Sequence, residues 1–375
     1  MKKIIVISDS FKGTISSSEI CRMAAESVPR FFPNCELITL PVADGGEGTA
    51  ECFIQSAGAT AVTVPTTGPY GEPISAVYAR MGDKAIIEMA CAAGLPMVGK
   101  RRDPSRTTTY GVGTVIRHAV ESGCREILLG LGGSATNDAG CGCAAALGVK
   151  FYDINGTDFV PTGSTLEKIH HIALADCRAL LSSVSITVMC DVENPLYGLN
   201  GAAHIFGPQK GADASMVASL DNGLKAFDRL LQQELGLSVA DLPGAGAAGG
   251  MGGGCVALLG ATLKSGIESI LDMVEFDSLL DGADLVITGE GRIDSQSVQG
   301  KVISGIAGRT APRNIPLVAI VGCIDESATL AYELGVTAMF GIDREARAFA
   351  DYAPQSADMY QKTLEDILRL IKAVQ

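Results

Sequence analysis

The sequence contains no tryptophan, and only 5% of its 375 residues are aromatic. None of its four histidines lies in an H-E-x-x-H pair or near a G-x-S-x-G turn, so neither a zinc enzyme nor a Ser-His-Asp hydrolase is expected. The aromatic residues form no array on which nucleic-acid bases could stack. Charged residues are scarce at 19% while hydrophobic residues reach 47%, a composition that excludes a disordered chain.

Basic residues are fewer than acidic ones. The chain has 29 lysines and arginines and 42 aspartates and glutamates, which gives a formal net charge of −13. This balance argues against a nucleic-acid partner, whose phosphate backbone requires clustered cations. An anionic small molecule is still compatible with it if local cations or helix N-termini offset the general field.

Long apolar runs are also absent. The first run, residues 4–7, stops at Ser8 and is too short for a signal peptide, and no segment reaches the roughly 20 residues of a membrane span. The 11 cysteines are scattered without a C-x-x-C pair, which fits a reducing cytosol better than a disulfide or zinc scaffold. We therefore expect a soluble cytoplasmic protein with no membrane partner.

Two groups of β-branched apolar runs predict the sheet of an α/β fold. Helical patterns separate the runs, as in parallel sheets. The runs lie at residues 4–7, 36–40 and 61–64, and again at 284–288, 317–321 and 338–340. The sequence therefore predicts a six-stranded parallel Rossmann-like sheet.

The same pattern predicts two domains. Residues 1–65 plus 283–375 would form a discontinuous Rossmann-like domain, and residues 66–282 would be a second, inserted α/β domain. Within the insert, the runs at 74–79 and 84–89 predict a hairpin. We expect the active site in the cleft between the domains, at the carboxyl ends of the strands.

Polar and glycine-rich loops follow several of these strands, and the chain has 45 glycines. In the first two loops, Ser10 precedes Lys12, which could reach a phosphate, and Asp44 and Glu47 have a spacing suited to Mg²⁺ or hydroxyl binding. Each loop can also be interpreted as an ordinary turn or helix start. Their common position after strands favours function.

A third loop, residues 130–138, follows a strand and opens a predicted helix. Residues 130–135 satisfy G-x-G-x-x-A, and Asp153 lies about 20 residues on, as in a dinucleotide fingerprint. A more general interpretation is an anion cradle made of freed amides with Ser134 and Thr136.

Two further segments carry candidate catalytic groups. Asp191 ends a strand and is a candidate base, or else a turn acid; Lys210 is a candidate phosphate partner, or else a solvated loop charge. Residues 289–301 contain Glu290, Arg292, Asp294 and Lys301. This segment is not a P-loop, because valine replaces the metal-binding hydroxyl of that motif. Its charged side chains are nevertheless too many for a segment that serves only in packing.

Together the loops indicate phosphoryl transfer by a kinase or ligase-like enzyme.

Seven motifs resemble the bacterial glycerate kinase family, type I, over nearly the whole chain. They are DSFKGT at 9–14, PVADGGEGT at 41–49, GLGGSATND at 130–138, DVENPLYG at 191–198, GPQKGA at 207–212, PGAGAAGGMG at 243–252 and GEGRIDSQS at 289–297. The resemblance implies a two-domain α/β fold and the ATP-dependent phosphorylation of D-glycerate, with 2-phosphoglycerate favoured over 3-phosphoglycerate. It also implies Mg²⁺, and we further consider a homodimer.

This resemblance gives each candidate residue an expected role. The catalytic candidates are Asp191, Asp294 and Lys12. The substrate-binding candidates are Ser10, Asp44, Arg292, Ser134, Thr136 and Asn137. Gly132, Gly133, Lys210 and Lys301 are expected to bind ATP, and Asp44, Glu47 and Glu290 to bind the metal ion.

Two other functions are considered. The first is an NAD-dependent dehydrogenase of a small hydroxy acid, using the turn at 130–135. The second is a non-catalytic sugar-acid-binding protein, although the helix-turn-helix or basic face usual in such regulators is not found in the sequence.

Overall fold

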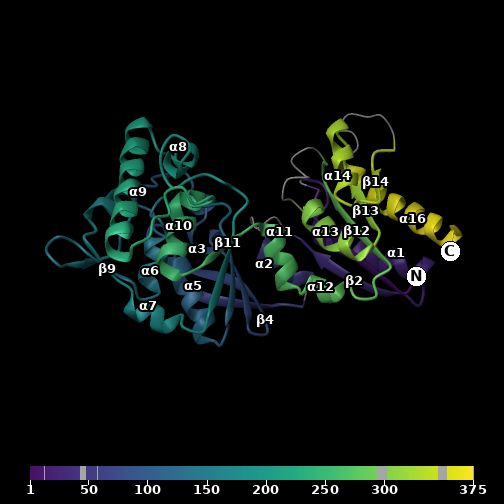
Figure 1. Ribbon diagram of the computed structural model, residues 1–375, viewed down its shortest axis with the longest axis horizontal. Helices are drawn as coiled ribbons and strands as arrows, with labels where there is room; N and C mark the ends of the chain where they lie inside the picture. The colour runs from purple at the N-terminus through teal and green to yellow at the C-terminus, as the bar shows by residue number, and fades with distance from the viewer. Residues whose placement is uncertain (12, 43–47, 57, 294–301, 345–352, 375) are drawn as a thin grey trace. The chain divides into compact units, whose positions relative to one another are not determined.

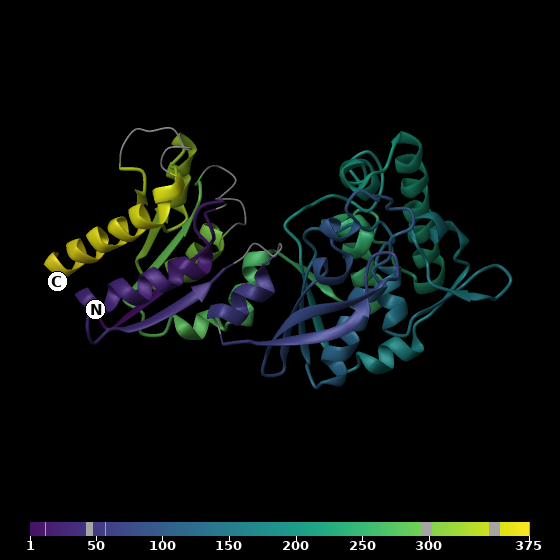
Figure 2. The ribbon, with the colours of Figure 1, turned by 180° about the vertical axis from the view of Figure 1, so that it is seen from behind.

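The computed structural model describes residues 1–11, 13–42, 48–56, 58–293, 302–344 and 353–374. It divides the chain into two compact units (Figures 1 and 2). Unit 1 comprises Met1–Asp44, Cys52–Gly58 and Ser265–Gln375, and unit 2 comprises Gly45–Glu51 and Ala59–Lys264. The expected residues Lys12, Asp44, Glu47, Asp294 and Lys301 lie outside the described residues.

Unit 1 is built on a parallel sheet of the order β14-β13-β12-β1-β2. Its strands are β1 (Lys3–Ser8), β2 (Glu36–Pro41), β12 (Leu285–Glu290), β13 (Leu317–Val321) and β14 (Ala338–Gly341). Its helices are α1 (Ser17–Phe31), α11 (Gly266–Met273), α12 (Phe276–Leu279), α13 (Val302–Thr310), α14 (Leu330–Glu333) and α16 (Ser356–Val374), with α2 (Thr49–Ser56) shared between the units and 3-10 turns η3 (Ala311–Arg313), η4 (Glu326–Thr329) and η5 (Ala353–Gln355).

Continuous apolar strands and an amphipathic helix explain how unit 1 packs. Residues 4–7 of β1 are fully buried, as expected for a parallel strand covered on both faces. Helix α1 begins with a capping box between Ser16 and Glu19 and buries Ile20, Met23 and Val28. It lies beside α16 on one face of the sheet (Figure 2).

Unit 2 contains a mixed six-stranded sheet of the order β11-β10-β6-β5-β4-β3. Its strands are β3 (Thr60–Thr67), β4 (Pro73–Met81), β5 (Lys84–Glu88), β6 (Glu126–Gly130), β10 (Ser185–Met189) and β11 (Thr262–Lys264), and β7 (Lys150–Tyr152), β8 (Asp158–Phe159) and β9 (His171–Ala173) form a small antiparallel sheet. Its helices are α3 (Ala90–Ala93), α4 (Leu95–Val98), α5 (Tyr110–Glu121), α6 (Cys141–Ala146), α7 (Ala175–Leu180), α8 (Ala202–Phe206), α9 (Ala214–Leu235) and α10 (Ala247–Leu259), with η1 (Gly163–Lys168) and η2 (Pro208–Lys210).

The α/β class and the β4–β5 hairpin are confirmed, but one strand was assigned to the wrong sheet. The expected six-stranded parallel sheet has five strands, because β3 pairs antiparallel with β4 in unit 2. Val64 of β3 is buried, whereas the flanking Thr63 and Pro65 are exposed. This one-sided burial is typical of an antiparallel strand and differs from a buried parallel run.

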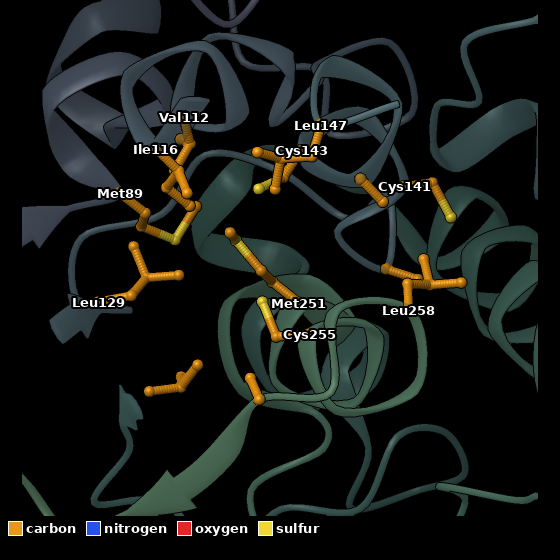
Figure 3. Close-up of a cluster of buried hydrophobic side chains, with 14 of the residues drawn as sticks. Met89, Val112, Ile116, Leu129, Cys141, Cys143, Leu147, Met251, Cys255 and Leu258 are labelled. Carbon is orange, nitrogen blue, oxygen red and sulfur yellow. The ribbon is translucent and has the colours of Figure 1, made fainter. Parts of the chain in front are cut away.

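The core of unit 2 brings α5, α6 and α10 together around sulfur-containing side chains (Figure 3). Helices α5 and α6 approach closely, since a Cβ on Gly113 would lie 2.2 Å from the Cys143 carbonyl oxygen. Burial raises the pKa of Cys141 and Cys143 well above the usual thiol value. These thiols therefore serve as small apolar groups. Among the described residues, no helix combines the length and hydropathy of a bilayer span.

Candidate functional site

Three neighbouring strands of unit 2 end together at one edge of its sheet. Strands β5, β6 and β10 are parallel, and Glu88 and Met189 are both in register with Gly130. The loop after β6 carries Ser134, Thr136 and Asn137, and Asp191 follows β10 as an exposed side chain. The carboxyl edge of a parallel sheet is where α/β proteins place their ligand-binding loops.

Lys210 is the residue whose placement differs most from a surface lysine. Its side chain is 2% exposed, and Nζ donates to Ser134 Oγ at 2.6 Å and to the Thr136 carbonyl oxygen at 2.7 Å. Burial lowers the pKa of Lys210 to about 7, against the opposing effect of the Asp138 carboxylate. The alternative of a solvated loop charge is therefore wrong.

Asp138 organises the same loop from inside. Its carboxylate accepts hydrogen bonds from the amide and hydroxyl of Thr109, both at 2.8 Å, and from the amides of Gly140 and Gly142 at 3.1 and 3.3 Å. Burial raises the pKa of Asp138, while these hydrogen bonds lower it. The hydrogen bonds from Gly140 and Gly142 thus tie this loop to the start of α6.

Unlike Asp138, the side chains of Asn137 and Thr136 have polar atoms that form no hydrogen bond with any described residue. Both residues are fully buried, and Asn137 Oδ1, Asn137 Nδ2 and Thr136 Oγ1 have no hydrogen-bond partner in the described part of the chain. Buried polar atoms of this kind are rare in proteins, and each calls for an explanation such as a ligand or water.

The glycine-rich segment at the start of α10 supports this loop by direct backbone packing. Gly249 has φ +71°, and a Cβ there would lie 2.0 Å from the Thr136 carbonyl oxygen and 2.6 Å from Asn137 Cα. The Ala139 amide donates to the Gly249 carbonyl oxygen at 3.1 Å, and the Gly246 amide donates to the Asn194 carbonyl oxygen at 2.9 Å. The segment thus joins the loop after β6 to the loop after β10.

Sequence reasoning missed two of the groups that hold this site. Thr107 Oγ1 donates to the Ala135 carbonyl oxygen at 2.9 Å, and Thr109 binds Asp138 as described. Both threonines are fully buried. In the sequence, these residues belong to the run of three consecutive threonines Thr107–Thr109, which looks like an ordinary polar loop. Their hydrogen-bond partners lie about 30 residues away in the chain, so no local pattern indicates the contacts.

The dinucleotide interpretation of residues 130–135 does not fit the local structure. A dinucleotide motif requires the helix to start at the glycine turn and the acidic residue to end the next parallel strand. Here α6 begins only at Cys141, and Asp153 follows β7 of the small antiparallel sheet. The Asp153 carboxylate instead accepts from the amides of Asn155 and Thr157, both at 2.8 Å.

Unit 1 places three expected residues at the carboxyl edge of its own sheet. Ser10 follows β1, Glu290 ends β12 as a buried side chain, and Arg292 lies two residues beyond the end of β12. Arg292 Nη2 lies 2.8 Å from Asp325 Oδ2. The Ser327 amide and the Arg292 side chain lower the pKa of Asp325 to about 2, so this ion pair persists at neutral pH.

The metal site stays a prediction. Of its three expected ligands, only Glu290 is described, and it lies in unit 1. Within the described ranges, no group of three or more His, Cys, Asp or Glu side chains is placed to hold a metal ion.

Two α/β units with polar loops at the carboxyl ends of parallel strands define an α/β enzyme architecture. The family model described as "Glycerate kinase family" matches residues 4–372. Curated relatives include a glycerate kinase of Bacillus subtilis (strain 168), 40% identical with 99% of this chain and 98% of the relative covered, and a glycerate 2-kinase of Escherichia coli (strain K12), 42% identical with 91% and 90% covered.

A solved structure agrees with these relatives. It is a crystal structure from Salmonella typhimurium LT2 provisionally assigned as glycerate kinase 2, with a TM-score of 0.87, 39% identity, and 100% of this chain and 99% of that chain covered. The chain belongs to the glycerate kinase family, which confirms the family resemblance of its seven motifs.

Proposed function

We propose that this protein transfers the terminal phosphoryl group of ATP to D-glycerate and releases 2-phosphoglycerate. The observation that carries the proposal is the family match over residues 4–372, accompanied by curated relatives named glycerate kinase at about 40% identity. The choice of the 2-phosphate is supported by the relative named glycerate 2-kinase, which is 42% identical.

The loop after β6 offers the chemistry that a hydroxy acid needs. The Asn137 amide can both donate to and accept from a carboxylate or hydroxyl group, and Ser134 and Thr136 add two hydroxyls beside it. We assign these three residues to glycerate, and the neighbouring Gly132 and Gly133 to the ATP phosphates. Desolvated donors in such a site interact more strongly with a developing charge than they would in water.

Lys210 acts on this loop from inside the protein. Because Nζ is buried and donates to Ser134 and Thr136, it holds the two residues in place and does not need to contact ATP. This changes its assignment from a nucleotide ligand to a positioning residue. With a pKa of about 7, the lysine carries less than a full positive charge at neutral pH.

Most of the remaining expected groups belong to unit 1, and Glu47 belongs to unit 2. Ser10 and Arg292 are assigned to glycerate, Lys12 to catalysis and Lys301 to the nucleotide. Mg²⁺ enters with ATP as part of the substrate and neutralises charge on the phosphates. Asp44, Glu47 and Glu290 are its proposed ligands, and that the active site lies between the domains stays a prediction.

The function is tested by an ADP-release assay with ATP, Mg²⁺ and a panel of small hydroxy acids. We expect turnover that depends on D-glycerate, and a product whose phosphorus NMR spectrum matches 2-phosphoglycerate. A 3-phosphoglycerate spectrum would contradict only the position of transfer. Thermal stabilisation by D-glycerate without ADP release would contradict the kinase and favour a non-catalytic sugar-acid-binding protein.

The catalytic base is the second testable assignment. Asp191 and Asp294 are the two candidates, and asparagine at the true base should lower turnover by about 10²–10⁴-fold, since the glycerate hydroxyl loses its proton acceptor. Exposed Asp158 on β8 provides the control variant Asp158→Asn. If Asp191→Asn and Asp294→Asn both turn over D-glycerate like the control, the base lies elsewhere.

A further inference from the structure

Unit 2 contains a cavity that neither the motifs nor the proposed function uses. Its volume is about 500 Å³, within the range of small-molecule sites. It lies between the turn that precedes β4 and the end of α4. The lining residues are Tyr70, Gly71, Glu72, Met97, Val98 and Arg101.

The lining residue Arg101 belongs to a short run of cations that follows α4, although the chain as a whole is acidic. Lys100, Arg101, Arg102 and Arg106 lie within seven residues of one another, in a chain of net charge −13. Lys100, Arg101 and Arg106 form no ion pair with any described carboxylate. The only acid among them, Asp103, accepts hydrogen bonds from the amide and hydroxyl of Ser105.

Two of the cations are held in place. The Arg101 guanidinium lies 4.1 Å from the centre of the Tyr70 ring, and the Tyr70 hydroxyl donates to the Arg101 carbonyl oxygen. Arg102 Nη1 donates to the Gln209 carbonyl oxygen at 3.1 Å, next to Lys210. A guanidinium fixed on an aromatic ring is prepared for a phosphate, because little freedom is lost on binding.

The lining matches the three parts of a nucleotide. Met97 and Val98 provide the apolar part of the lining, on which a base could pack, and Glu72 is an acid of the kind that accepts ribose hydroxyls. Arg101 and Lys100 suit phosphates. Glycerate has neither an apolar part to cover the wall nor the size to fill the cavity, so a three-carbon acid would leave most of it to water.

The cavity is also joined to the glycine turn assigned to ATP. The Leu95 amide at the start of α4 donates to the Gly133 carbonyl oxygen at 2.7 Å, and the Ala135 amide donates to the Ala93 carbonyl oxygen at 2.9 Å. Gly94 and Ser134 form an isolated β-bridge. The wall that carries Met97 and Val98 is thus bonded to the turn at 132–134.

We propose that this cavity binds ATP, with the adenine against Met97 and Val98, the ribose at Glu72, and the phosphates reaching from Arg101 and Lys100 toward Gly132 and Gly133. The proposal rests on the proposed kinase function. It adds the adenine site, which no motif indicated, and places it wholly within unit 2.

The test uses the exposed residues Arg101 and Met97 in the full-length protein. Arg101→Ala removes a charge-assisted contact to phosphate, and Met97→Glu places a carboxylate on the apolar wall. Each should raise KM for ATP, and Kd for ADP by calorimetry, by about tenfold or more, and leave KM for D-glycerate within about twofold. Arg178→Ala on α7 is the control, with no change expected.

The outcomes separate this inference from the proposed function. If both variants bind ADP like the wild type, or if KM for D-glycerate rises instead, the cavity is not the nucleotide site, and the kinase assignment is unaffected. The inference is also overturned if the wild type binds no ADP. If ADP binding depends on Arg101 but D-glycerate is not phosphorylated, the cavity assignment stands and the kinase assignment fails.

Discussion

Lys210→Met is expected to lower kcat/KM for D-glycerate by on the order of 10²-fold, because small displacements of positioned groups are costly in catalysis. Methionine fills a similar volume but donates nothing, so Ser134 Oγ and the Thr136 carbonyl oxygen each lose a buried donor. Steady-state kinetics measure the effect. Lys168→Met, at an exposed position of η1, should match the wild type, and equal kinetics in both variants would exclude a positioning role.

The stability of the wild type relative to Lys210→Met should depend on pH, because only the wild type contains the buried lysine. The folded-state pKa of Lys210 is about 7, below the ordinary value of 10.5. Between these values the unfolded chain binds a proton that the folded protein lacks, so wild-type stability should gain about 1 kcal/mol per pH unit from this group. Below pH 7 the lysine is charged in both states and the cost of burying that charge is fully present.

Urea denaturation at pH 7, 8 and 9 measures this dependence. The difference in unfolding free energy between the wild type and Lys210→Met should shift in favour of the wild type as the pH rises. A difference that stays constant over this range would mean that Lys210 keeps its ordinary pKa in the folded protein.

Gly249→Ala is expected to damage both stability and activity. A Cβ at this position would lie 2.0 Å from the Thr136 carbonyl oxygen, so the loop that carries Thr136 and Asn137 must move. We expect a loss on the order of 3 kcal/mol in unfolding free energy, from steric overlap added to backbone strain. The displaced loop should also lower kcat/KM by on the order of 10²-fold.

Gly260 provides a matched control at the other end of α10. Its φ of +68° is close to the +71° of Gly249, but a Cβ there would meet nothing within 4 Å. Gly260→Ala should therefore cost only about 1 kcal/mol of backbone strain and leave the kinetics unchanged. Denaturation and steady-state assays of the two variants would contradict the packing argument if they gave equal losses.

Local sequence patterns predicted most of the fold because the signals lie in short stretches. The β-branched run at 4–7 indicated β1, and the loops at 130–138 and 191–198 were correctly placed after strands. The assignment of β3 failed because a short apolar run does not specify its partner. In the structure, Val62 pairs with Tyr78 of β4. This pairing lets β3 bury one face against unit 2, which the run of apolar residues alone does not indicate.

The interior of the candidate site was less predictable, because its contacts join distant parts of the chain. Lys210 and Ser134 are 76 residues apart, and a lysine in a glycine-rich turn gives no signal that it will be buried. Asp138 and Thr109 are 29 residues apart. Such pairings follow from the packing of whole segments, above all the close approach of Gly249, and no local motif encodes them.

The sulfur-rich interior of unit 2 has a consequence for its chemistry with oxidants (Figure 3). Cys141, Cys143 and Cys255 are almost wholly shielded from solvent, and burial raises their thiol pKa, to about 12 for Cys255. Thiolates are the reactive form, so alkylating or oxidising agents reach these sulfurs only when α6 and α10 separate. The rate at which they are modified therefore reports how often this part of the protein opens.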